Sequence, residues 1–279
     1  MGKDVILSKS CIKEQIMFLK PNFKEDLFKG TADFYTKYRP PYLESLINSL
    51  LKEADIKKND KLLDLACGSG RLSIPLAKYF NEVVAVDLEE EMIFVGKKTA
   101  EDLNIKNIQW LIGKAEEFTA SPETFKLITI GDAFHRLDQL SVLQNVFRVL
   151  KTGGYLAIIG GSIFIHGDRD WQKLLNKILL KWRNQASDNN NINYKEQFPN
   201  ALIEFGFKDV HRCDFEEKGK STVEEIIGLL RSMSIYSKKA IGNDNDEFEK
   251  TIRDSLLDLE PKNSFEYDFN CGYTIGRKD

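Results

Sequence analysis

Apolar and polar positions along this chain alternate in blocks that predict buried strands separated by amphipathic helices. Short apolar runs, several ending in a turn or an acidic residue, indicate strands at 62–65, 82–87, 108–112, 125–130 and 155–159. Between them, apolar residues recur at helical spacing, most clearly over 42–54 and 137–150. Strands that alternate with helices in this way form a parallel sheet with helices on both faces. We therefore expect an α/β fold.

The second half of the chain predicts longer helical segments around a sixth strand. We place that strand at 207–215, with a structural role for His211, and a last strand at 265–277 that runs antiparallel to the others. Residues 161–206 and 216–262 are then helical insertions, the first of which contains a polar loop at 187–193. The N-terminal residues are expected to form a helical arm that stops at the double proline at 40–41.

The segment 62–73 organises the chain, because a strand with an acid near its end turns through glycines into a helix. Glycines let backbone approach a ligand, and a helix N-terminus presents unpaired N–H groups. A dinucleotide site needs a third glycine in this turn, and Ala66 and Arg71 break that pattern. Asp64 would repel a pyrophosphate, and it would attract a cofactor that carries ammonium and sulfonium groups.

These residues carry a resemblance to a known family. The segment 61–77 resembles the first motif of the class I (Rossmann-like) S-adenosylmethionine-dependent methyltransferases, and the resemblance covers most of 31–160. It implies a doubly wound, seven-stranded sheet with the last strand antiparallel. It further implies an N-terminal lid over residues 1–45 and a methyltransferase domain over 46–279, whose helical insertions cover the substrate. The cofactor would be S-adenosylmethionine, with S-adenosylhomocysteine as product.

The same resemblance nominates cofactor-binding residues on successive turns. Asp87, at the end of the second strand, would hold the ribose hydroxyls; alternatively it caps the next helix. Glu116 would border the adenine, or it is a solvated acid in a helix first turn. The segment 35–40 is similar to a Tyr-x-x-Tyr-Arg-Pro lid of small-molecule methyltransferases. The expected cofactor residues are Tyr38, Arg39, Asp64, Ala66, Gly68, Ser69, Gly70, Asp87, Leu88, Met92, Ala115, Glu116 and Asp132.

The acceptor side is expected after the fourth strand, whose carboxyl end faces the reacting methyl in this fold. Residues 133–135 are similar to a segment of the trans-aconitate-like branch, although Arg136 stands where that branch has an aromatic residue. His135 is the catalytic candidate, either as a general base or as a residue that positions the acceptor. The substrate candidates are Tyr35, Arg136, His166 and Trp171. An arginine and a histidine at this place suit an anionic or hydroxyl-bearing acceptor.

Charge, cysteine content and apolar runs limit the classes of binding partner that we expect. The formal net charge of −3 over 279 residues gives no broad basic surface for nucleic acid. The four cysteines are far apart without a C-x-x-C pair, which indicates free thiols in a reducing compartment and no metal site. The longest apolar run, 155–165, is too short to span a bilayer. We expect a cytoplasmic monomer or homodimer without membrane contact.

Methyl transfer to a small molecule is the function that these patterns favour. Three alternatives stay open: a peptide, protein or RNA acceptor; a non-catalytic protein that binds S-adenosylmethionine; and a nicotinamide oxidoreductase. The acidic charge balance counts against RNA. Asp64 and the missing glycine at position 71 count against the nicotinamide cofactor. The sequence does not name the acceptor, or say whether O, N, S or C is methylated.

Overall fold

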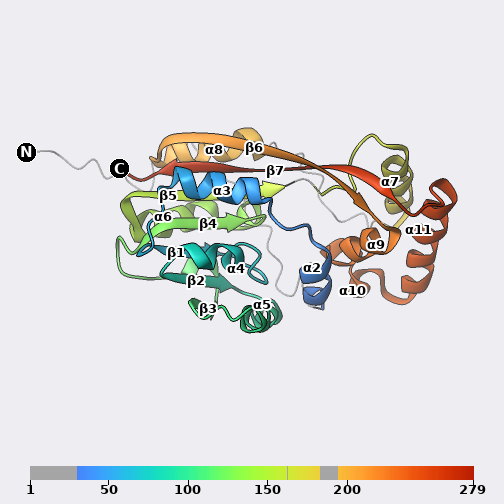
Figure 1. Ribbon diagram of the computed structural model, residues 1–279, viewed down its shortest axis with the longest axis horizontal. Helices are drawn as coiled ribbons and strands as arrows, with labels where there is room; N and C mark the ends of the chain where they lie inside the picture. Colours follow the sequence, from blue (N-terminus) through green and yellow to red (C-terminus); the bar gives the residue numbers. More distant parts are fainter. Residues whose placement is uncertain (1–29, 162, 183–193) are drawn as a thin grey trace, which may run out of the picture.

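A seven-stranded sheet forms the centre of the molecule in the computed structural model, which describes residues 30–161, 163–182 and 194–279 (Figure 1). The strand order is β3-β2-β1-β4-β5-β7-β6. Most of the expected N-terminal arm (1–29) and the expected polar loop at 187–193 lie outside the described residues. The strands are β1 (Lys61–Leu65), β2 (Glu82–Asp87), β3 (Ile108–Ile112), β4 (Phe125–Gly131), β5 (Leu150–Gly161), β6 (Lys208–Ser221) and β7 (Phe265–Arg277).

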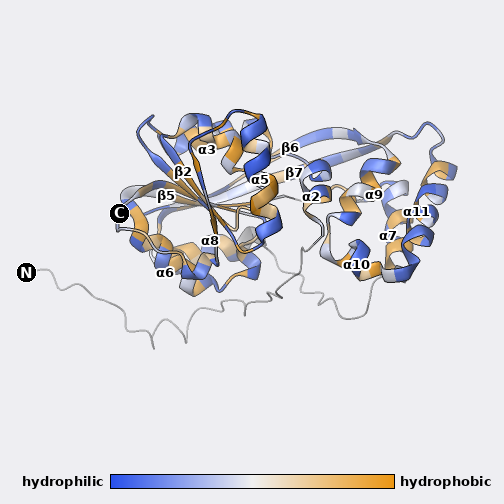
Figure 2. Ribbon diagram, turned by 90° about the horizontal axis from the view of Figure 1, so that it is seen from below, coloured by the Kyte–Doolittle hydropathy of each residue, from blue (hydrophilic) through white to orange (hydrophobic). Residues whose placement is uncertain are grey.

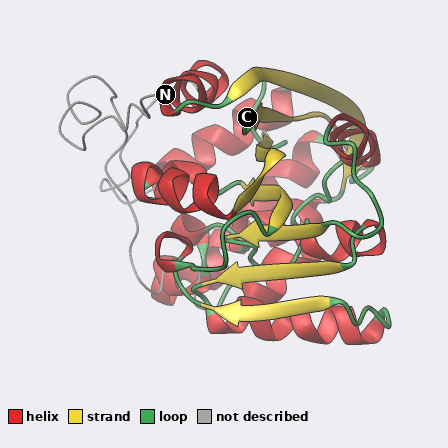
Figure 3. Cartoon of the chain, turned by 90° about the vertical axis from the view of Figure 1, so that its left-hand side faces the viewer, coloured by secondary structure: helices red, strands yellow, loops and turns green. Residues whose placement is uncertain are grey.

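Strands β1 to β5 pair in parallel, and β7 runs antiparallel between β5 and β6. Figure 3 shows neighbouring strands that point the same way with helices on both sides. The predicted α/β fold with an antiparallel last strand is therefore confirmed. Parallel strands end at the same edge of the sheet, so the turns after β1, β2, β3 and β4 meet there.

Helices cover both faces of the sheet because its strands are buried on both sides. Helices α3, α4 and α5 lie on one face and α6 and α8 on the other (Figure 2). Leu62 and Leu63, adjacent on β1, are fully buried in the clusters of opposite faces. The bounds are α3 (Glu44–Glu53), α4 (Ser73–Leu76), α5 (Glu90–Asp102), α6 (Gln139–Val149) and α8 (Tyr194–Phe205).

Two short segments depart from regular structure at proline and glycine. The helix that follows the glycine turn is only α4, succeeded by a 3-10 turn, η1 (Ala77–Tyr79), and Pro75 lies inside α4. Helix α6 stops at Val149. Gly153 lies within β5 at φ 71°, where the pairing with β4 shifts register. The positive φ thus serves a strand irregularity.

The helical insertions differ from their predicted bounds at two places. Strand β6 continues to Ser221, where a helical insertion was expected from residue 216, because it stays paired with β7 to its end. Helix α8 packs Phe198 and Leu202 into the sheet core, so it belongs to the sheet layers although it was expected in the first insertion. The remaining helices form a separate cluster at the far end of β6 and β7, which we call the cover (Figure 1). They are α2 (Ala32–Tyr38), α7 (Asp170–Trp182), α9 (Val223–Arg231), α10 (Lys238–Ile241) and α11 (Asn245–Leu259).

The cover has its own apolar core, built from α7, α9 and α11. At its centre Arg231 is 1% exposed, and its guanidinium bonds Glu249 at 3.0 Å and the Tyr236 and Asn245 carbonyls at 3.1 Å. A buried charge needs such complete pairing. Short 3-10 turns complete the structure: η2 (Ala115–Glu117), η3 (Phe134–Arg136), η4 (Ser234–Tyr236) and η5 (Gly242–Asp244). None of the helices in the described ranges has the length and apolar composition that crossing a bilayer requires.

Candidate active site

A cavity of about 330 Å³ lies where the turns after β1, β2, β3 and β4 meet. It brings together most of the residues expected to bind the cofactor: Ala66, Gly68, Asp87, Leu88, Met92, Ala115, Glu116 and Asp132. Tyr35 and Arg136, expected on the substrate side, line it as well. We call it the cofactor cavity. Its further lining residues, which the sequence patterns did not single out, are Glu89, Gly113, Lys114, Gly131, Ala133, Leu137 and Asp138.

The Asp87 carboxylate accepts hydrogen bonds from two backbone segments that border the cofactor cavity. One carboxylate oxygen accepts the Gly68 N–H at 2.7 Å, and the other accepts the Glu89 N–H at 2.9 Å at the start of α5. A carboxylate has about four acceptor positions, so these bonds leave capacity for a ligand hydroxyl. Burial raises the pKa of Asp87, while the backbone N–H groups oppose that rise. Asp87 therefore fixes the glycine turn and still faces the cavity.

The turn itself depends on left-handed backbone. Ala66 and Gly68 adopt φ values of 52° and 55°. Alanine in this region costs about 1–2 kcal/mol relative to right-handed backbone. Gly70, at φ 81°, does not line the cavity: a Cβ there would lie 2.4 Å from the Trp110 ring. Gly70, expected among the cofactor residues, thus allows the turn to pack on Trp110.

Asp64 and Ser69 also lie outside the cofactor cavity. Asp64 is 1% exposed, and its oxygens accept the hydroxyls of Ser73 at 2.5 Å and Thr129 at 2.8 Å. Burial raises the pKa of Asp64 to about 6, against the lowering effect of these two bonds. Asp64 was expected to hold a cofactor ammonium through a close contact or a water, and in the structure it ties β1 to α4 and β4 behind the turn. Ser69 is buried in the same turn.

A second and larger cavity, of about 650 Å³, adjoins the first. Both cavities are lined by Asp132, Ala133 and Arg136, so the segment after β4 forms their common wall. We call the second one the acceptor cavity. It reaches from this wall to the end of β5, the middle of β6 and β7, and the start of η4. Its other lining residues include Arg39, His135, Ile163, Phe198, Arg212, Asp214, Met233, Ser234, Ile235, Asn270 and Cys271.

Glycines hollow the floor of the acceptor cavity. Gly160 on β5 and Gly272 on β7 are register partners. A Cβ on Gly272 would lie 2.7 Å from the Asp214 carboxylate and 2.8 Å from the Arg212 guanidinium. The absence of a side chain at Gly272 thus leaves room for the Arg212–Asp214 pair, joined at 2.8 Å. Cavity lining from β6 and β7 was not foreseen from the sequence.

His135 lies in the acceptor cavity with its neighbour as a hydrogen-bond partner. The Arg136 Nε–H donates to His135 Nε2 at 3.2 Å, so Nε2 is the acceptor nitrogen of a neutral imidazole. Burial, with a smaller effect of Arg136, lowers the pKa of His135 to about 4. The imidazole is therefore uncharged at neutral pH, with its acceptor lone pair directed at a guanidinium.

Asp132 is held rigidly between the cavities. Tyr42 donates its hydroxyl to the carboxylate at 2.8 Å, and the Gly161 N–H donates at 3.1 Å. Arg71 lies 3.6 Å away, over the Tyr42 ring. Burial, with the Asp132 charge, raises the pKa of Tyr42 well above its ordinary value, so the phenol stays a donor. Asp132 itself has a φ of 53°, which projects it into the wall.

Tyr35 and Arg39 each line the cavity opposite to the one that the sequence predicted. Tyr35, expected on the substrate side, lines the cofactor cavity, and Arg39, expected at the cofactor, lines the acceptor cavity. Arg39 donates to the Ser232 hydroxyl at 2.9 Å. Tyr38 lines neither cavity, because its ring packs on Gly228 of α9. The side chains at 35 and 39 lie one helical turn apart, with Tyr38 on the face toward the cover.

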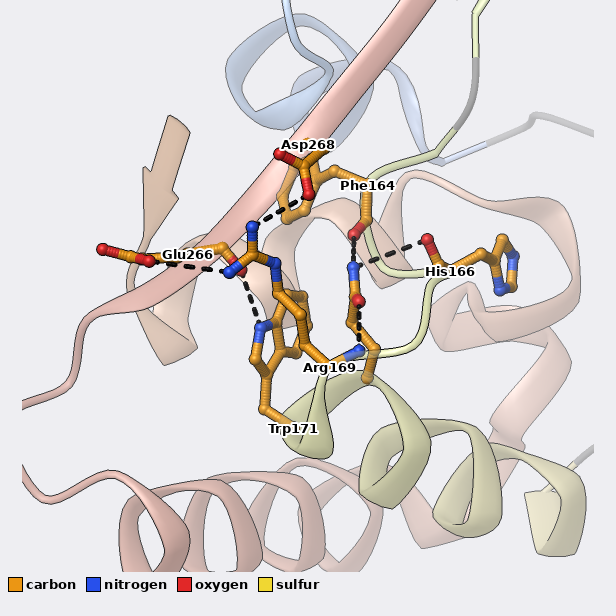
Figure 4. A network of polar contacts seen from close by, with 7 residues as sticks. Phe164, His166, Arg169, Trp171, Glu266 and Asp268 are labelled. Atoms are coloured by element: carbon orange, nitrogen blue, oxygen red, sulfur yellow. Dashed lines mark hydrogen bonds and ion pairs between the residues drawn. The ribbon is translucent and has the colours of Figure 1, made fainter. Parts of the chain in front are cut away.

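His166 and Trp171 were expected to bind substrate, and the structure places both away from the two cavities. Trp171 is buried and donates its indole N–H to the Glu266 carbonyl at 2.8 Å, next to an ion pair between Arg169 and Asp268 (Figure 4). The exposed His166 ring is directed away from this network (Figure 4). Both therefore belong to the junction between β7 and the cover.

The two cavities differ in charge. The cofactor cavity has five carboxylates, from Asp87, Glu89, Glu116, Asp132 and Asp138, against Lys114 and Arg136. Its acidic lining fits a cofactor with ammonium and sulfonium groups and opposes a pyrophosphate. Apolar Leu88 and Met92 supply surface for a purine ring. The residues present therefore fit S-adenosylmethionine.

Comparisons with known proteins agree with this geometry. Residues 56–226, more than half of the chain, match the family described as a methyltransferase domain. An uncharacterized methyltransferase of Schizosaccharomyces pombe is 27% identical over 255 residues, which are 89% of this chain and 92% of that protein. A demethylmenaquinone methyltransferase of Bacillus cereus is 38% identical over 104 residues, 36% of this chain and 44% of the relative.

A solved structure of an S-adenosylmethionine-dependent methyltransferase from Aquifex aeolicus has a TM-score of 0.50 at 18% identity. The alignment covers 88% of this chain and 97% of that one, which shows a common fold. The strand order, the acidic cavity at the strand ends and the family match lead to one conclusion. The chain belongs to the methyltransferase domain family, and its fold is that of the class I, S-adenosylmethionine-dependent enzymes.

Proposed function

We propose that this protein transfers a methyl group from S-adenosylmethionine to a small molecule that carries an anionic group. The observation that carries the proposal is the pair of adjoining cavities, one acidic and one lined by three arginines, with a common wall at 132–136. A volume of about 650 Å³ suits a metabolite or natural product and is too small for a folded protein or an RNA helix.

In the cofactor cavity, Asp87 would accept ribose hydroxyls, and Leu88, Met92 and Ala115 would contact the adenine. Tyr35 covers this cavity from the lid helix α2. S-adenosylmethionine supplies a methyl group on a positively charged sulfur, which is a good leaving group. The protein's part is to exclude water and to orient the acceptor, and alignment of this kind contributes up to about 7–11 kcal/mol to a reaction barrier.

The acceptor cavity supports an anionic substrate through its arginines. Arg39 donates to the Ser232 hydroxyl, and Arg136 donates to neutral His135. Arg212 pairs with Asp214, and Asp132 on the opposite side pairs with Arg71. Apolar Ile163, Phe198, Met233 and Ile235 line the rest of the cavity. Such a lining suits an organic acid or phosphate ester with an apolar body.

His135 is proposed as a positioning residue. A general base works best with a pKa near the operating pH. The pKa of His135, lowered to about 4 by burial, makes the imidazole a weak base, and Arg136 occupies its acceptor nitrogen. His135 therefore holds the Arg136 guanidinium at the common wall, and the acceptor supplies its own nucleophilic lone pair or anion.

An assay with S-adenosylmethionine labelled in the transferred methyl tests this function on matched acceptors, each offered as a carboxylate and as its primary amide. We expect turnover to favour the carboxylate member. In Arg212→Gln we expect KM for that acceptor to rise about tenfold, with affinity for S-adenosylhomocysteine unchanged, because Arg212 lines only the acceptor cavity.

Arg253→Gln is the matched control, because Arg253 forms an exposed pair with Glu224 at 2.9 Å on α11, away from both cavities. Equal turnover of acids and amides would contradict the anionic acceptor. Binding of S-adenosylhomocysteine without methyl transfer to any small acceptor, but with transfer to a peptide or RNA, would replace the small-molecule assignment.

A further inference from the structure

Strand β6 presents different chemistry on its two faces. Arg212 and Asp214 line the acceptor cavity, and side chains alternate along a strand, so His211 and Cys213 lie on the opposite face toward α3. There His211 Nε2, Cys213 Sγ and a carboxylate oxygen of Glu53 all lie within 4.8 Å of one another. Methyl transfer as described above makes no use of these three groups.

A bond on the far side of its ring orients His211. A register shift between Lys208 and His211 and a φ of 51° at Asp209 bring the Asp209 carbonyl to 2.9 Å from Nδ1. A carbonyl can only accept, so Nδ1 carries the proton and donates. Nε2 then faces Glu53 Oε1 at 2.8 Å. A metal ion bound between these two acceptor atoms would satisfy both of them.

Glu53 is oriented in the same manner. The Tyr273 hydroxyl donates to Glu53 Oε2 at 2.9 Å, and the Ser49 hydroxyl lies 2.9 Å from the same phenol oxygen. A carboxylate can only accept, so the phenol is the donor in this bond. Metal-binding histidines and carboxylates commonly have such outer hydrogen bonds, which fix the ligand atoms before the ion arrives.

We propose that Glu53, His211 and Cys213 bind a divalent ion of the zinc class. One thiolate, one imidazole and one carboxylate form a mixed set that suits zinc and opposes calcium or magnesium. Bond lengths of about 2.0–2.3 Å in tetrahedral geometry separate ligand atoms by roughly 3.3–3.6 Å. The 2.8 Å contact and the 4.8 Å limit bracket that value, so small side-chain shifts admit the ion.

The ligands come from positions 53, 211 and 213, which is why cysteine spacing predicted no metal site. Three protein ligands leave the fourth position of a tetrahedral ion for water. The His211 side chain is 46% exposed, which gives the ion a path from solvent. Bound there, the ion ties α3 to β6, directly behind the strand face that carries Arg212 and Asp214. We therefore assign it a structural role next to the acceptor cavity.

Cobalt titration of the chelator-treated, full-length protein tests the site. We expect about one equivalent of Co²⁺ to bind with the near-ultraviolet absorption of a thiolate–cobalt bond, and Zn²⁺ to displace it. Cys213→Ser should lose that absorption, and His211→Ala should weaken binding at least tenfold. Tyr273→Phe, which removes the outer bond to Glu53 together with the Ser49 contact, should weaken it about 10–100-fold. Zinc at a hundredfold excess over its Kd should raise the Tm of the wild type by roughly 5 °C.

Cys271→Ser, Cys11→Ser and His166→Ala are the matched controls and should keep the full cobalt signal. The proposal is overturned if the wild type shows no thiolate–cobalt absorption, or if the absorption persists in Cys213→Ser. Because the site lies on the face of β6 opposite the acceptor cavity, titration with S-adenosylhomocysteine reports on the proposed function independently. Failure of one proposal is therefore distinguishable from failure of the other.

Discussion

The two cavities that meet at Asp132 are built in opposite ways. The cofactor cavity is acidic and is assembled from turns that each follow a strand directly, between positions 66 and 138, with Tyr35 added from the lid. The acceptor cavity carries three arginines and draws its lining from positions between 39 and 271. The first depends on backbone geometry that a few local residues dictate, and the second on how the cover, β6 and β7 pack together. The lining of the cofactor cavity is therefore fixed by the fold, while the lining of the acceptor cavity can vary with the cover.

The largest effect that we expect concerns Asp64, behind the cofactor cavity. Its pKa is about 6 in the folded protein and about 3.9 in the unfolded chain, so the folded state binds more protons between these values. The free energy of unfolding contributed by Asp64 therefore falls as pH rises from 4 to 6, by about 3 kcal/mol. Asp64→Asn removes this dependence.

Urea unfolding of wild type and Asp64→Asn at pH 4, 5, 6 and 7 measures the difference. His135, with its pKa lowered to about 4, contributes the opposite slope, because its unfolded form binds the extra proton between pH 4 and 6.5. That contribution is common to both proteins and cancels. A difference between the two proteins that does not change with pH would contradict the buried, partly protonated Asp64.

Asp87 provides the direct contrast with Asp64 inside the cofactor cavity. Asp87→Ala removes the proposed ribose acceptor and releases the Gly68 and Glu89 N–H groups. We expect affinity for S-adenosylhomocysteine to fall 10- to 100-fold by calorimetric titration, since hydrogen bonds to a charged group contribute about 1.5–3 kcal/mol. Glu90→Ala, an exposed acid in the first turn of α5, is the control. A larger loss of affinity in Asp64→Asn than in Asp87→Ala would reverse the assigned roles.

The same contrast explains how far the sequence could predict this molecule. The turns at 66–68, 87–92 and 115–116 follow their strands immediately, so a local pattern placed them correctly in the cavity. Asp64 and Gly70 belong to the same motif, yet they serve packing on Thr129 and Trp110, partners 40 to 65 residues away. Sequence patterns identify such residues as a group without separating ligand contacts from supports.

The residues of the acceptor cavity could not be predicted from local sequence patterns. His166 and Trp171 were chosen for their chemistry in an insertion, and they lie at the junction between β7 and the cover. Arg212 and Asp214 lie on a strand that alternates weakly, and their place in a cavity depends on Gly272 in another strand. The exchange of Tyr35 and Arg39 follows from how α2 docks on α9. A side chain's direction there depends on tertiary packing, which has no local signal.

A substitution at the contact between α2 and α9 tests whether the packing of the cover affects cofactor binding. In Gly228→Ala the new Cβ would lie 2.4 Å from the Tyr38 ring, so α2 must shift and move Tyr35. We expect affinity for S-adenosylhomocysteine to fall about three- to tenfold. Helix propensity alone would favour alanine by up to about 1 kcal/mol, so any loss reports the overlap.

A second substitution decides the cause. Tyr38→Leu combined with Gly228→Ala relieves the overlap, and the double variant should bind S-adenosylhomocysteine more tightly than Gly228→Ala alone. If Tyr38→Leu by itself lost more affinity than Gly228→Ala, and the double variant recovered nothing, Tyr38 would be a cofactor contact after all.

The smallest effect is expected at the residue that looks most like a catalyst. General bases contribute about 10²–10⁴ to a rate. His135 has a pKa lowered to about 4 and an acceptor nitrogen bonded to Arg136, so His135→Asn, which keeps a hydrogen-bonding side chain of similar reach, should lower kcat less than about threefold. The profile of kcat against pH between 5.5 and 8 should have the same shape in both proteins, because His135 stays neutral throughout that range. A fall of a hundredfold or more, together with loss of an acidic limb in the profile, would make His135 the base. The acceptor cavity would then contain a catalytic residue as well as binding residues. In that case the common wall at 132–136 would carry fixed chemistry, and the contrast between a fixed cofactor cavity and a variable acceptor cavity would not hold there.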